Sequence, residues 1–396
     1  MNDDINIFTD NIEPEAVNQV YNLIAQPPFA GAKVRIMPDV HMGMNCVVGF
    51  TSTYSDKIIP NVLGGDLGCG MLTVYLGAGL ESISLKALDD FIRAKIPCGS
   101  NYRKEVNGEA HVKKLDCFSE LRDFDRLYGS LGTLGGGNHF IEVDRDDDGG
   151  LYLVIHSGSR NLGLQVAKIY QKLAVHDCKF CADEEKAAAS DRLKACGKQA
   201  EIPAALSAIS AKYAHKTKIP NDFCYLDGAN MAAYIHDLKI CQEFAVMNRR
   251  KMADDILKFL RISRTQSFET VHNFIDSDDI IRKGAIPAHK GQRVIIPMNM
   301  RDGCLIAVGK GNPDWNNSAP HGAGRLLRRS EAKDYFTVDE FKAQMQGVYT
   351  TTVGASTLDE SPMVYKPMAE IVRLIEPTVE IEKIVKPIYN FKAGEQ

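Results

Sequence analysis

A helix-rich block at residues 162–261 separates two segments that have the pattern of short strands, and this arrangement constrains the fold more than any other feature. Residues 30–160 and 267–325 alternate short apolar runs with glycine-rich turns, which is typical of strands that end in loops. Within residues 162–261 apolar side chains recur three and four positions apart, which is typical of helices. Because the strand-forming segments have to come together around the helical insertion, we expect one interwoven α+β domain of mixed sheets over residues 1–396. The predicted strands include residues 47–50, 72–75, 151–155 and 293–296, and the predicted helices residues 166–175, 187–198 and 231–260.

The composition and the net charge limit the kinds of partner that this chain can be expected to bind. No stretch approaches the roughly 18 apolar residues that a membrane span needs, and the acidic start is unlike a secretory signal, so we expect no membrane partner. Ten cysteines in such a chain indicate reduced thiols and a cytoplasmic location. The net charge is −4, so a nucleic-acid partner has to be held by a local basic patch. Two such clusters are Arg325, Arg328, Arg329 and Lys333, and Arg282, Lys283, His289 and Lys290.

A carboxylate and a thiol, Asp66 and Cys69, stand three residues apart in the peptide Gly-Gly-Asp-Leu-Gly-Cys-Gly. The surrounding glycines allow a ligand to approach the backbone closely. Three histidines, His139, His156 and His272, stand where strands are expected to end. Together these groups favour zinc, or manganese if phosphate oxygens complete the shell. Each histidine alone is equally well explained as a hydrogen-bonded turn residue, so the metal prediction depends on the whole set.

Cys178 and Cys181 form a competing metal motif, Cys-Lys-Phe-Cys. A structural zinc site needs four ligands, and no second Cys-x-x-Cys follows at the usual spacing. His176 can add a third ligand, but the motif lies inside the helical insertion. The sequence therefore does not favour a structural zinc site at this motif, and the remaining cysteines are interpreted as small buried or half-buried residues.

The peptide at residues 318–325, Ser-Ala-Pro-His-Gly-Ala-Gly-Arg, is a candidate phosphate-binding loop. Gly322 and Gly324 allow backbone N–H groups to approach a phosphate, and Arg325 can donate a two-pronged pair to its oxygens. His321 can serve as a metal ligand, a base or a nucleophile, because a neutral imidazole can attack phosphorus. The simpler interpretation, which is compatible with the first, is the N-terminus of a helix over residues 326–332.

Seven short motifs resemble, in the same order, those of the RtcB family of RNA-splicing ligases. The resemblance runs from about residue 30 to the peptide Phe391-Lys392-Ala393-Gly394. Any one motif alone would be weak, whereas seven in order are highly specific. The motifs are Met37–Gly43, Gly65–Met71, Gly137–Glu142, His156–Arg160, His272–Asn273, Arg282–Ala285 and His321–Arg325.

This resemblance implies an RtcB-like catalytic domain with two Mn²⁺ ions and GTP. It implies that Cys69 bridges the two metals, that Asp66, His139, His156 and His272 are the other ligands, and that His321 takes GMP from GTP. The implied GTP contacts are Asn138, Glu142, Asn273, Gly322, Ala323, Gly324 and Lys392, with Glu142 and Lys392 at the guanine. Ligand softness alone would favour zinc, whereas the resemblance favours manganese.

The resemblance also implies the reaction. Members of the family join an RNA end that carries a 2′,3′-cyclic phosphate or a 3′-phosphate to a 5′-hydroxyl end, in RNA repair or tRNA splicing. The implied contacts to RNA phosphates are Asp39, His41, Arg160 and Arg325. An archease-like activator or a release-factor-like protein is the protein partner that the resemblance suggests. Two other classes stay open: a two-metal phosphodiesterase or phosphatase on RNA ends, and a non-catalytic RNA-end-binding protein.

The chain departs from the family pattern in two places. Residues Met298–Gly303 stand where many members carry Gly-Ser-Met-Gly, at the expected nucleotide pocket. After Gly43 the chain lacks the Lys-Gly of typical members. Because every expected ligand and His321 are present, we expect an active enzyme of a divergent subgroup.

Overall fold

Strands from both sides of the helical block pair in one sheet, as the prediction of an interwoven domain requires. The computed structural model describes residues 4–78, 83–105, 108–263 and 266–393, so the match expected at Gly394 lies outside the described residues. The five-stranded sheet has the order β1-β2-β3-β11-β10, with β1 parallel to β2 and the other neighbours antiparallel. Its strands are β1 (Ile5–Ile7), β2 (Val34–His41), β3 (Val48–Thr53), β10 (Asn273–Ile275) and β11 (Ile280–Lys283).

The second sheet has seven antiparallel strands in the order β13-β14-β16-β6-β7-β5-β9. Its two edge strands come into contact, because the backbone N–H of Ile295 in β13 donates to Oγ1 of Thr270 in β9 over 3.1 Å. The sheet is therefore rolled. The strands are β5 (Gly70–Ala78), β6 (Phe140–Arg145), β7 (Gly150–Ser157), β9 (Gln266–Val271), β13 (Arg293–Asn299), β14 (Gly303–Gly309) and β16 (Val379–Lys392). Two short pairs join β4 (Lys57–Ile58) to β8 (Leu226–Asp227), and β12 (Ala285–Pro287) to β15 (Ser318–Pro320).

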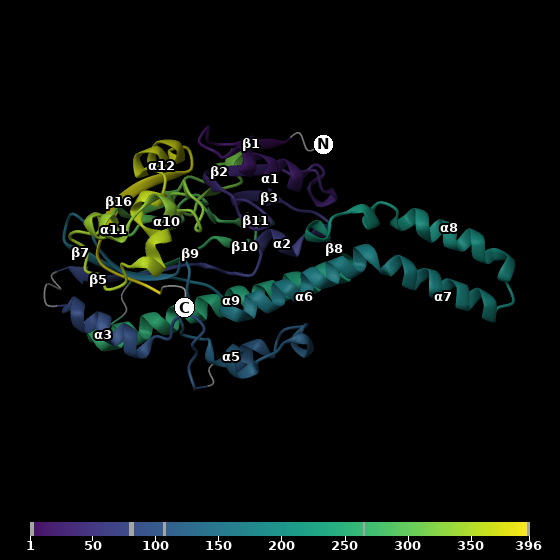
Figure 1. Cartoon of the computed structure of the whole chain (residues 1–396), viewed down its shortest axis with the longest axis horizontal. Coiled ribbons are helices and arrows are strands. Elements are labelled where there is room, and N and C mark those ends of the chain that lie inside the picture. The colour runs from purple at the N-terminus through teal and green to yellow at the C-terminus, as the bar shows by residue number, and fades with distance from the viewer. Residues whose placement is uncertain (1–3, 79–82, 106–107, 264–265, 394–396) are drawn as a thin grey trace.

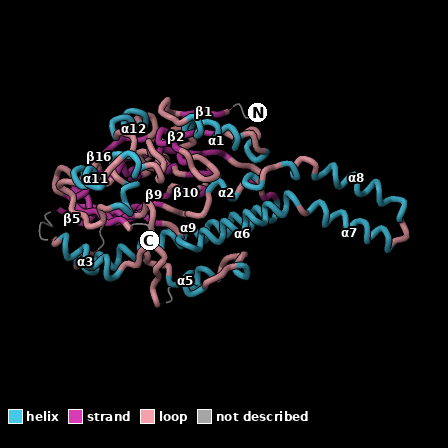
Figure 2. Tube along the Cα trace, in the orientation of Figure 1, coloured by secondary structure: helices cyan, strands magenta, loops and turns pink. Residues whose placement is uncertain are grey.

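The predicted helical insertion is present between β7 and β9. It contains α6 (Arg160–Lys179), α7 (Cys181–Ala195), α8 (Ile202–Tyr213) and α9 (Gly228–Leu260). Helices α7 and α8 run side by side and project away from the sheets, whereas α6 and α9 lie along the body of the molecule (Figures 1 and 2). The remaining helices are α1 (Pro14–Ile24), α2 (Pro60–Leu63), α3 (Leu85–Lys95), α4 (Glu109–Val112), α5 (Phe124–Gly129), α10 (Ala332–Tyr335), α11 (Val338–Gln344) and α12 (Met368–Ile375).

Helix α9 fixes the position of the glycine-rich loop around Cys69. Its apolar residues at helical spacing, among them Met252 and Ile256, are fully buried and belong to one core cluster with the inner residues of β5, β6 and β7. Arg249 on the same helix is also fully buried, and its guanidinium donates to the backbone oxygens of Gly68 and Ser157 over 3.0 and 2.8 Å and to Glu269 over 2.8 Å. A buried guanidinium with these partners holds the ends of β5, β7 and β9 together.

The structure confirms the α+β class and the predicted strands, and it corrects two local predictions. No helix forms over residues 326–332, because the N–H of Leu326 donates to the oxygen of Val364 and Arg325 forms a bridge with Tyr365; helix α10 begins only at Ala332. His139 precedes β6 rather than ending a strand, whereas His156 lies near the end of β7 and His272 follows β9. No helix among the described residues is long and apolar enough to cross a membrane.

Candidate active site

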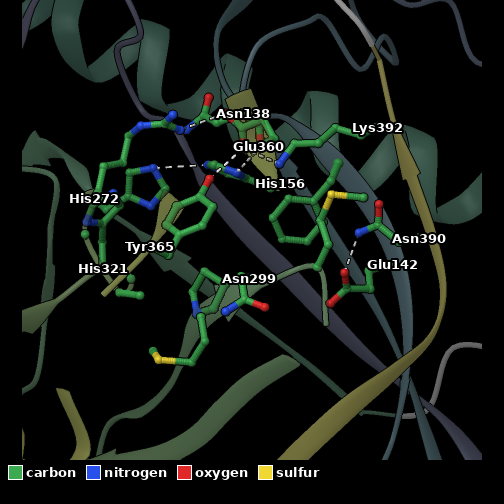
Figure 3. A pocket seen from close by; sticks show the side chains of 18 of the residues that line it. Asn138, Glu142, His156, His272, Asn299, His321, Glu360, Tyr365, Asn390 and Lys392 are labelled. Carbon is green, nitrogen blue, oxygen red and sulfur yellow. Dashed lines mark hydrogen bonds and ion pairs between the residues drawn. The ribbon is translucent and has the colours of Figure 1, made fainter. Parts of the chain in front are cut away.

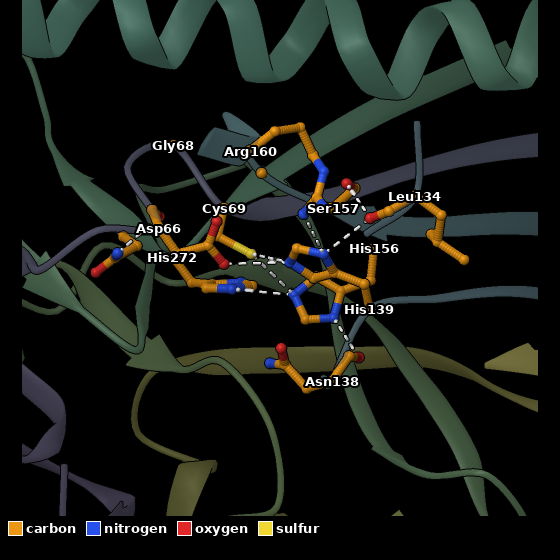
Figure 4. Close-up of polar contacts among 12 residues, drawn as sticks. Asp66, Gly68, Cys69, Leu134, Asn138, His139, His156, Ser157, Arg160 and His272 are labelled. Carbon is orange, nitrogen blue, oxygen red and sulfur yellow. Dashed lines mark hydrogen bonds and ion pairs between the residues drawn. The ribbon is translucent and has the colours of Figure 1, made fainter. Parts of the chain in front are cut away.

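Five side chains predicted as metal ligands converge at one end of the rolled sheet. β7, β5 and β9 are adjacent antiparallel strands, and this pairing brings His156, Cys69 and His272 to the same end. Asp66 comes from the loop before β5, and His139 from the loop before β6. Except for the half-buried Asp66, all of these residues are buried. Figure 4 shows the imidazoles and the thiol pointing toward one another.

The donors form two groups of three that share the sulfur of Cys69. One group is Cys69, His156 and His272, and the other is Asp66, Cys69 and His139. In the first group, Nε2 of His156 lies 3.2 Å from the sulfur and 3.2 Å from Nε2 of His272. In the second, Nε2 of His139 lies 3.5 Å from the sulfur and 3.2 Å from Oδ2 of Asp66. One sulfur therefore lies between two sets of donors.

The hydrogen bonds behind the imidazoles orient their lone pairs toward this centre. Nδ1 of His139 donates to the backbone oxygen of Leu134 over 2.9 Å, and Nδ1 of His156 donates to that of Asn138 over 3.2 Å. Each Nε2 then carries a lone pair that faces the thiol and a neighbouring ring. Converging lone pairs repel one another unless a cation or protons lie between them, so the donor set fits metal ions.

Burial decides the protonation of His156, His272 and Cys69. Loss of solvation, with the neighbouring imidazoles as a smaller cause, lowers the pKa of His156 and His272 well below the ordinary value, so both rings are neutral. Burial, with the charge of Asp66 as a smaller cause, raises the pKa of the Cys69 thiol. Neutral imidazole is the form that binds a metal, and a bound cation replaces the thiol proton.

Two glycines make room for this arrangement. Gly68 has a φ of +71°, and a Cβ atom there would lie 2.7 Å from the Cα of Gln242 in α9. A Cβ atom on Gly158 would lie 2.1 Å from Oδ1 of Asp66. Both positions therefore need glycine, for a left-handed turn under the helix and for close approach of the carboxylate.

His321 lies next to the metal-ligand cluster and is held by a buried aspartate. The His321 and His272 rings lie 4.8 Å apart between centroids. Oδ2 of Asp39, which is fully buried, lies 2.6 Å from Nδ1 of His321 and accepts the backbone N–H groups of His321 and Gly322 over 3.1 and 3.2 Å. Nδ1–H donates to the carboxylate, so Nε2 of His321 carries the free lone pair. Asp39 was expected to contact RNA phosphate; its geometry instead supports a role in positioning His321.

A cavity of about 110 Å³ lies between His321 and β16. Its walls include His41, Asn138, His156, His272 and the loop Gly322–Arg325, together with Met298, Asn299 and Met300 from the region that departs from the family pattern. Figure 3 shows these side chains from close by. On the side of His41 and Arg328 the cavity adjoins a second hollow of about 460 Å³, and His41, Asn138, His321, Arg325 and Arg329 line both.

Glu142 lines the far side of the cavity, and a second acidic residue, Asp144, lies next to it. Glu142 accepts a hydrogen bond from Nδ2 of Asn390 and lies within 4.8 Å of Asp144 and Cys304. Burial raises the pKa of both carboxyls, and the charge of Glu142 raises the pKa of Asp144 further. The pair therefore retains a proton to higher pH than a free carboxyl does, and Asp144 retains its proton to higher pH than Glu142. Neither Asp144 nor Asn390 was expected from the sequence, because no short motif connects β16 to β6.

A cluster of charges around Glu360 closes the cavity. Its carboxylate contacts the Nζ of Lys392, the guanidinium groups of Arg329 and Arg325, and the hydroxyl of Tyr365. Burial alone would raise the pKa of Glu360, but the positive charges of Lys392, Arg329 and Arg325 outweigh it and lower the pKa to about 2. Arg325, expected to bind RNA phosphate, is thus turned toward Glu360. No sequence motif indicated Glu360, which is the last residue of a short 3₁₀ helix (Ala355–Glu360) after α11.

Two of the remaining predicted residues lie on the metal side rather than in the cavity. Nδ2 of Asn273 donates to the backbone oxygens of Leu63 and Asp66 over 3.0 and 2.7 Å, which shapes the Asp66 loop. Arg160 has a φ of +60° and packs its guanidinium 3.3 Å from Nδ1 of His139. By contrast, Asn138, Gly322, Ala323, Gly324 and Lys392 all line the cavity.

The fold and the site define a class of α+β proteins in which a cluster of histidine, cysteine and aspartate side chains that could hold metal ions lies beside a cavity that a histidine borders. The family model described as tRNA-splicing ligase RtcB matches residues 19–120 and 106–393, and the chain belongs to this family. It is 27% identical to the RNA-splicing ligase RtcB of Escherichia coli strain K12, over 93% of this chain and 92% of the relative. It is 25% identical to the tRNA-splicing ligase RtcB of Nanoarchaeum equitans, over 94% and 90% of the two chains.

Proposed function

We propose that this protein is a GTP- and manganese-dependent RNA ligase that joins a 2′,3′-cyclic phosphate or 3′-phosphate end to a 5′-hydroxyl end through a guanylylated His321. The observation that carries the proposal is the position of His321, with Nδ1 on the Asp39 carboxylate and its ring 4.8 Å from that of the expected metal ligand His272. A nucleophile, the group that orients it and a metal-ligand set thus lie in one place.

His321 would act in the first two of three steps, both times through Nε2. Its Nε2 lone pair attacks the α-phosphorus of GTP, so a P–N bond forms, the bond to pyrophosphate breaks and pyrophosphate leaves. An oxygen of the RNA 3′-phosphate then attacks the same phosphorus, the P–N bond breaks and His321 is restored. The 5′-hydroxyl of the second RNA end finally attacks the activated RNA phosphorus and expels GMP. Asp39 holds the Nδ1 proton throughout and stabilises the positive charge that develops on the ring.

The two donor groups around Cys69 would hold two Mn²⁺ ions, with Asp66 and His139 on one side and His156 and His272 on the other. Such ions neutralise phosphate oxygens and lower the pKa of bound water, which supports opening of a cyclic phosphate. The thiolate must remain reduced for this role, so we place the enzyme in a reducing compartment such as the cytoplasm.

The base of GTP would lie toward Glu142. An ionised Glu142 presents only acceptors, which match the two adjacent N–H donors on the guanine edge. Lys392 would lie with Glu142 at the guanine, and Asn138, Ala323 and Gly324 would contact the rest of the nucleotide. The N–H of Gly322 already donates to Asp39, so Gly322 would border the nucleotide without donating to it. Asn273 would act through the Asp66 loop. His41, Arg160, Arg325, Arg328 and Arg329 supply the polar and positive groups for RNA ends, with affinity that falls as salt rises. An archease-like activator or a release-factor-like protein remains the proposed protein partner.

Incubation with GTP labelled at the α-phosphate and Mn²⁺ tests the proposal. We expect an acid-labile protein–GMP adduct that mass spectrometry locates at His321, and no adduct in His321→Ala. Absence of the adduct in the wild-type chain would support a non-catalytic RNA-end-binding protein. Full RNA-end processing by His321→Ala, without ligation in either protein, would instead support a two-metal phosphodiesterase or phosphatase.

A further inference from the structure

A second set of metal-binding donors lies at the junction of α6 and α7, at the base of the projecting hairpin. The sulfur of Cys181 lies 3.8 Å from Nδ1 of His176 and 3.7 Å from Oδ1 of Asp177, and these two atoms lie 3.9 Å from each other. Zinc bonds of about 2.0–2.3 Å place neighbouring tetrahedral ligands roughly 3.4–3.6 Å apart. The three donors therefore need to move by only a few tenths of an ångström to share one ion.

The imidazole of His176 and the carboxylate of Asp177 each have a hydrogen-bond partner on the side away from Cys181. Nε2–H of His176 donates to Oε1 of Glu184 over 3.1 Å, so the lone pair on Nδ1 faces Cys181 and Asp177. Nδ2 of Asn230, on α9, donates to the other oxygen of Asp177 over 2.8 Å, which leaves Oδ1 for the site. A carboxylate behind a ligating histidine and an amide behind a ligating carboxylate are typical outer partners of metal ligands.

The other cysteine of the Cys-x-x-Cys motif takes no part in this set. Cys178 is buried, and its sulfur lies 3.8 Å from the backbone oxygen of Tyr225. The helix interruption at Phe180 separates the two cysteines, so Cys181 groups with His176 and Asp177 instead. The ligands that the structure brings together therefore differ from those of the sequence motif, because the carboxylate of Asp177 takes the place of the Cys178 thiol.

We propose that His176, Asp177 and Cys181 bind one divalent zinc-class cation, with water as the fourth ligand. Sulfur, imidazole and carboxylate together suit zinc better than magnesium or calcium. On binding, the Cys181 thiol loses its proton to solvent and the sulfur–metal bond forms. The ion joins the end of α6 to the start of α7 and, through Asn230, to α9, so it fixes the direction in which the α7–α8 hairpin leaves the body (Figure 1).

This site is independent of the proposed ligase chemistry. His176 is 16 residues after Arg160 on the same helix, and at 1.5 Å per residue the two are about 24 Å apart along the axis. A change at Cys181 should therefore leave GMP labelling of His321 unaltered.

Cobalt titration of the full-length chain tests the proposal, because Co²⁺ replaces zinc and gives a charge-transfer band when a thiolate binds it. Cys69→Ala serves as the background, since it removes the thiolate of the proposed catalytic centre. We expect this variant to show the charge-transfer band at one equivalent of Co²⁺. Added zinc should displace the Co²⁺ and abolish the band. The band should disappear in Cys69→Ala/Cys181→Ser and persist in Cys69→Ala/Cys196→Ser, where the replaced cysteine is exposed at the end of the hairpin. His176→Gln should weaken binding by at least tenfold.

No band in Cys69→Ala, or a band that survives Cys181→Ser, would overturn the proposal. Circular dichroism of each variant shows whether the fold is intact. As a second measurement, the zinc content of the purified single variant Cys181→Ser should be one equivalent below that of the otherwise unmodified chain, and equal zinc content in the two proteins would also refute the site.

Discussion

Oδ2 of Asp39 lies 2.6 Å from Nδ1 of His321 and also accepts the backbone N–H groups of His321 and Gly322. One buried oxygen thereby fixes both the tautomer of the imidazole and the path of the loop that carries it. Gly324 completes the arrangement, because a Cβ atom there would lie 2.3 Å from the backbone oxygen of Asp39. The strand β2 and the loop after β15 thus act as one unit around the proposed nucleophile.

Asp39→Asn should slow guanylylation of His321 by roughly 100-fold, because the amide keeps an oxygen acceptor but not the charge that stabilises the attacking ring. Single-turnover labelling with GTP measures this rate. Asp314→Asn, at an exposed aspartate, is the matched control. An unchanged rate in Asp39→Asn would show that the carboxylate only shapes the loop.

Cys69→Ala should remove both metal ions and abolish labelling, because the two donor groups share this sulfur. Metal analysis after equilibration with Mn²⁺ checks the stoichiometry, with Cys196→Ala as the control. A variant that retains two equivalents of manganese would contradict the bridging role of Cys69.

Glu360→Gln should reduce the acid sensitivity of the fold. The pKa of Glu360 is lowered to about 2 in the folded protein from an ordinary value of 4.5, so its stabilisation is present above about pH 4.5 and is lost as the pH falls toward 2. A shift of this size corresponds to roughly 3 kcal/mol. Urea unfolding between pH 7 and pH 3 should show a steeper loss of stability in the wild-type chain than in the variant, and parallel curves would argue against the prediction.

Asp144→Asn should leave GMP labelling intact and stabilise the fold at alkaline pH. The pKa of Asp144 is raised by burial and by Glu142, so this residue contributes an unfavourable free energy that begins above its unfolded pKa of about 4 and grows until its folded pKa is reached. The amide is neutral and can still donate to Glu142. The variant should therefore be more stable than the wild-type chain at pH 8, and the two proteins should unfold alike at pH 4. A loss of stability at pH 8 would indicate that Asp144 is ionised and paired.

The sequence was sufficient for the parts of the fold that local pattern determines. The apolar runs at 72–75, 151–155 and 293–296 lie within β5, β7 and β13, and the periodic segment 231–260 is most of α9. The helix expected over 326–332 is absent because contacts with residues 364 and 365 override the helical propensity of this segment. Such contacts between distant segments leave no local signal.

The same distinction applies to the site. The glycine-rich peptides and isolated histidines identified the residues that gather around Cys69, since each has an unusual local composition. Glu360, Asn390 and Asp144 could not be found in this way, because their surroundings in the sequence are ordinary. The pairing of β16 with β6 and the packing of the residue 355–365 segment bring Asn390 and Glu360 to the cavity, and Asp144 lies next to Glu142, which lines it. Their importance depends on burial next to other charges, which is a property of the tertiary structure.

The position of β16 within the seven-stranded sheet determines the stage of synthesis at which the cavity can be completed. β16 lies between β14 and β6, so it is an interior strand although it follows every other strand of that sheet in the chain. In a nascent chain that has not yet added residue 379, β14 and β6 each have an unpaired edge, although β13 and β9 can still meet as they do in the complete sheet. The cavity wall at Asn390 and Lys392 is absent at that stage, so the proposed nucleotide site is incomplete until β16 has been synthesised.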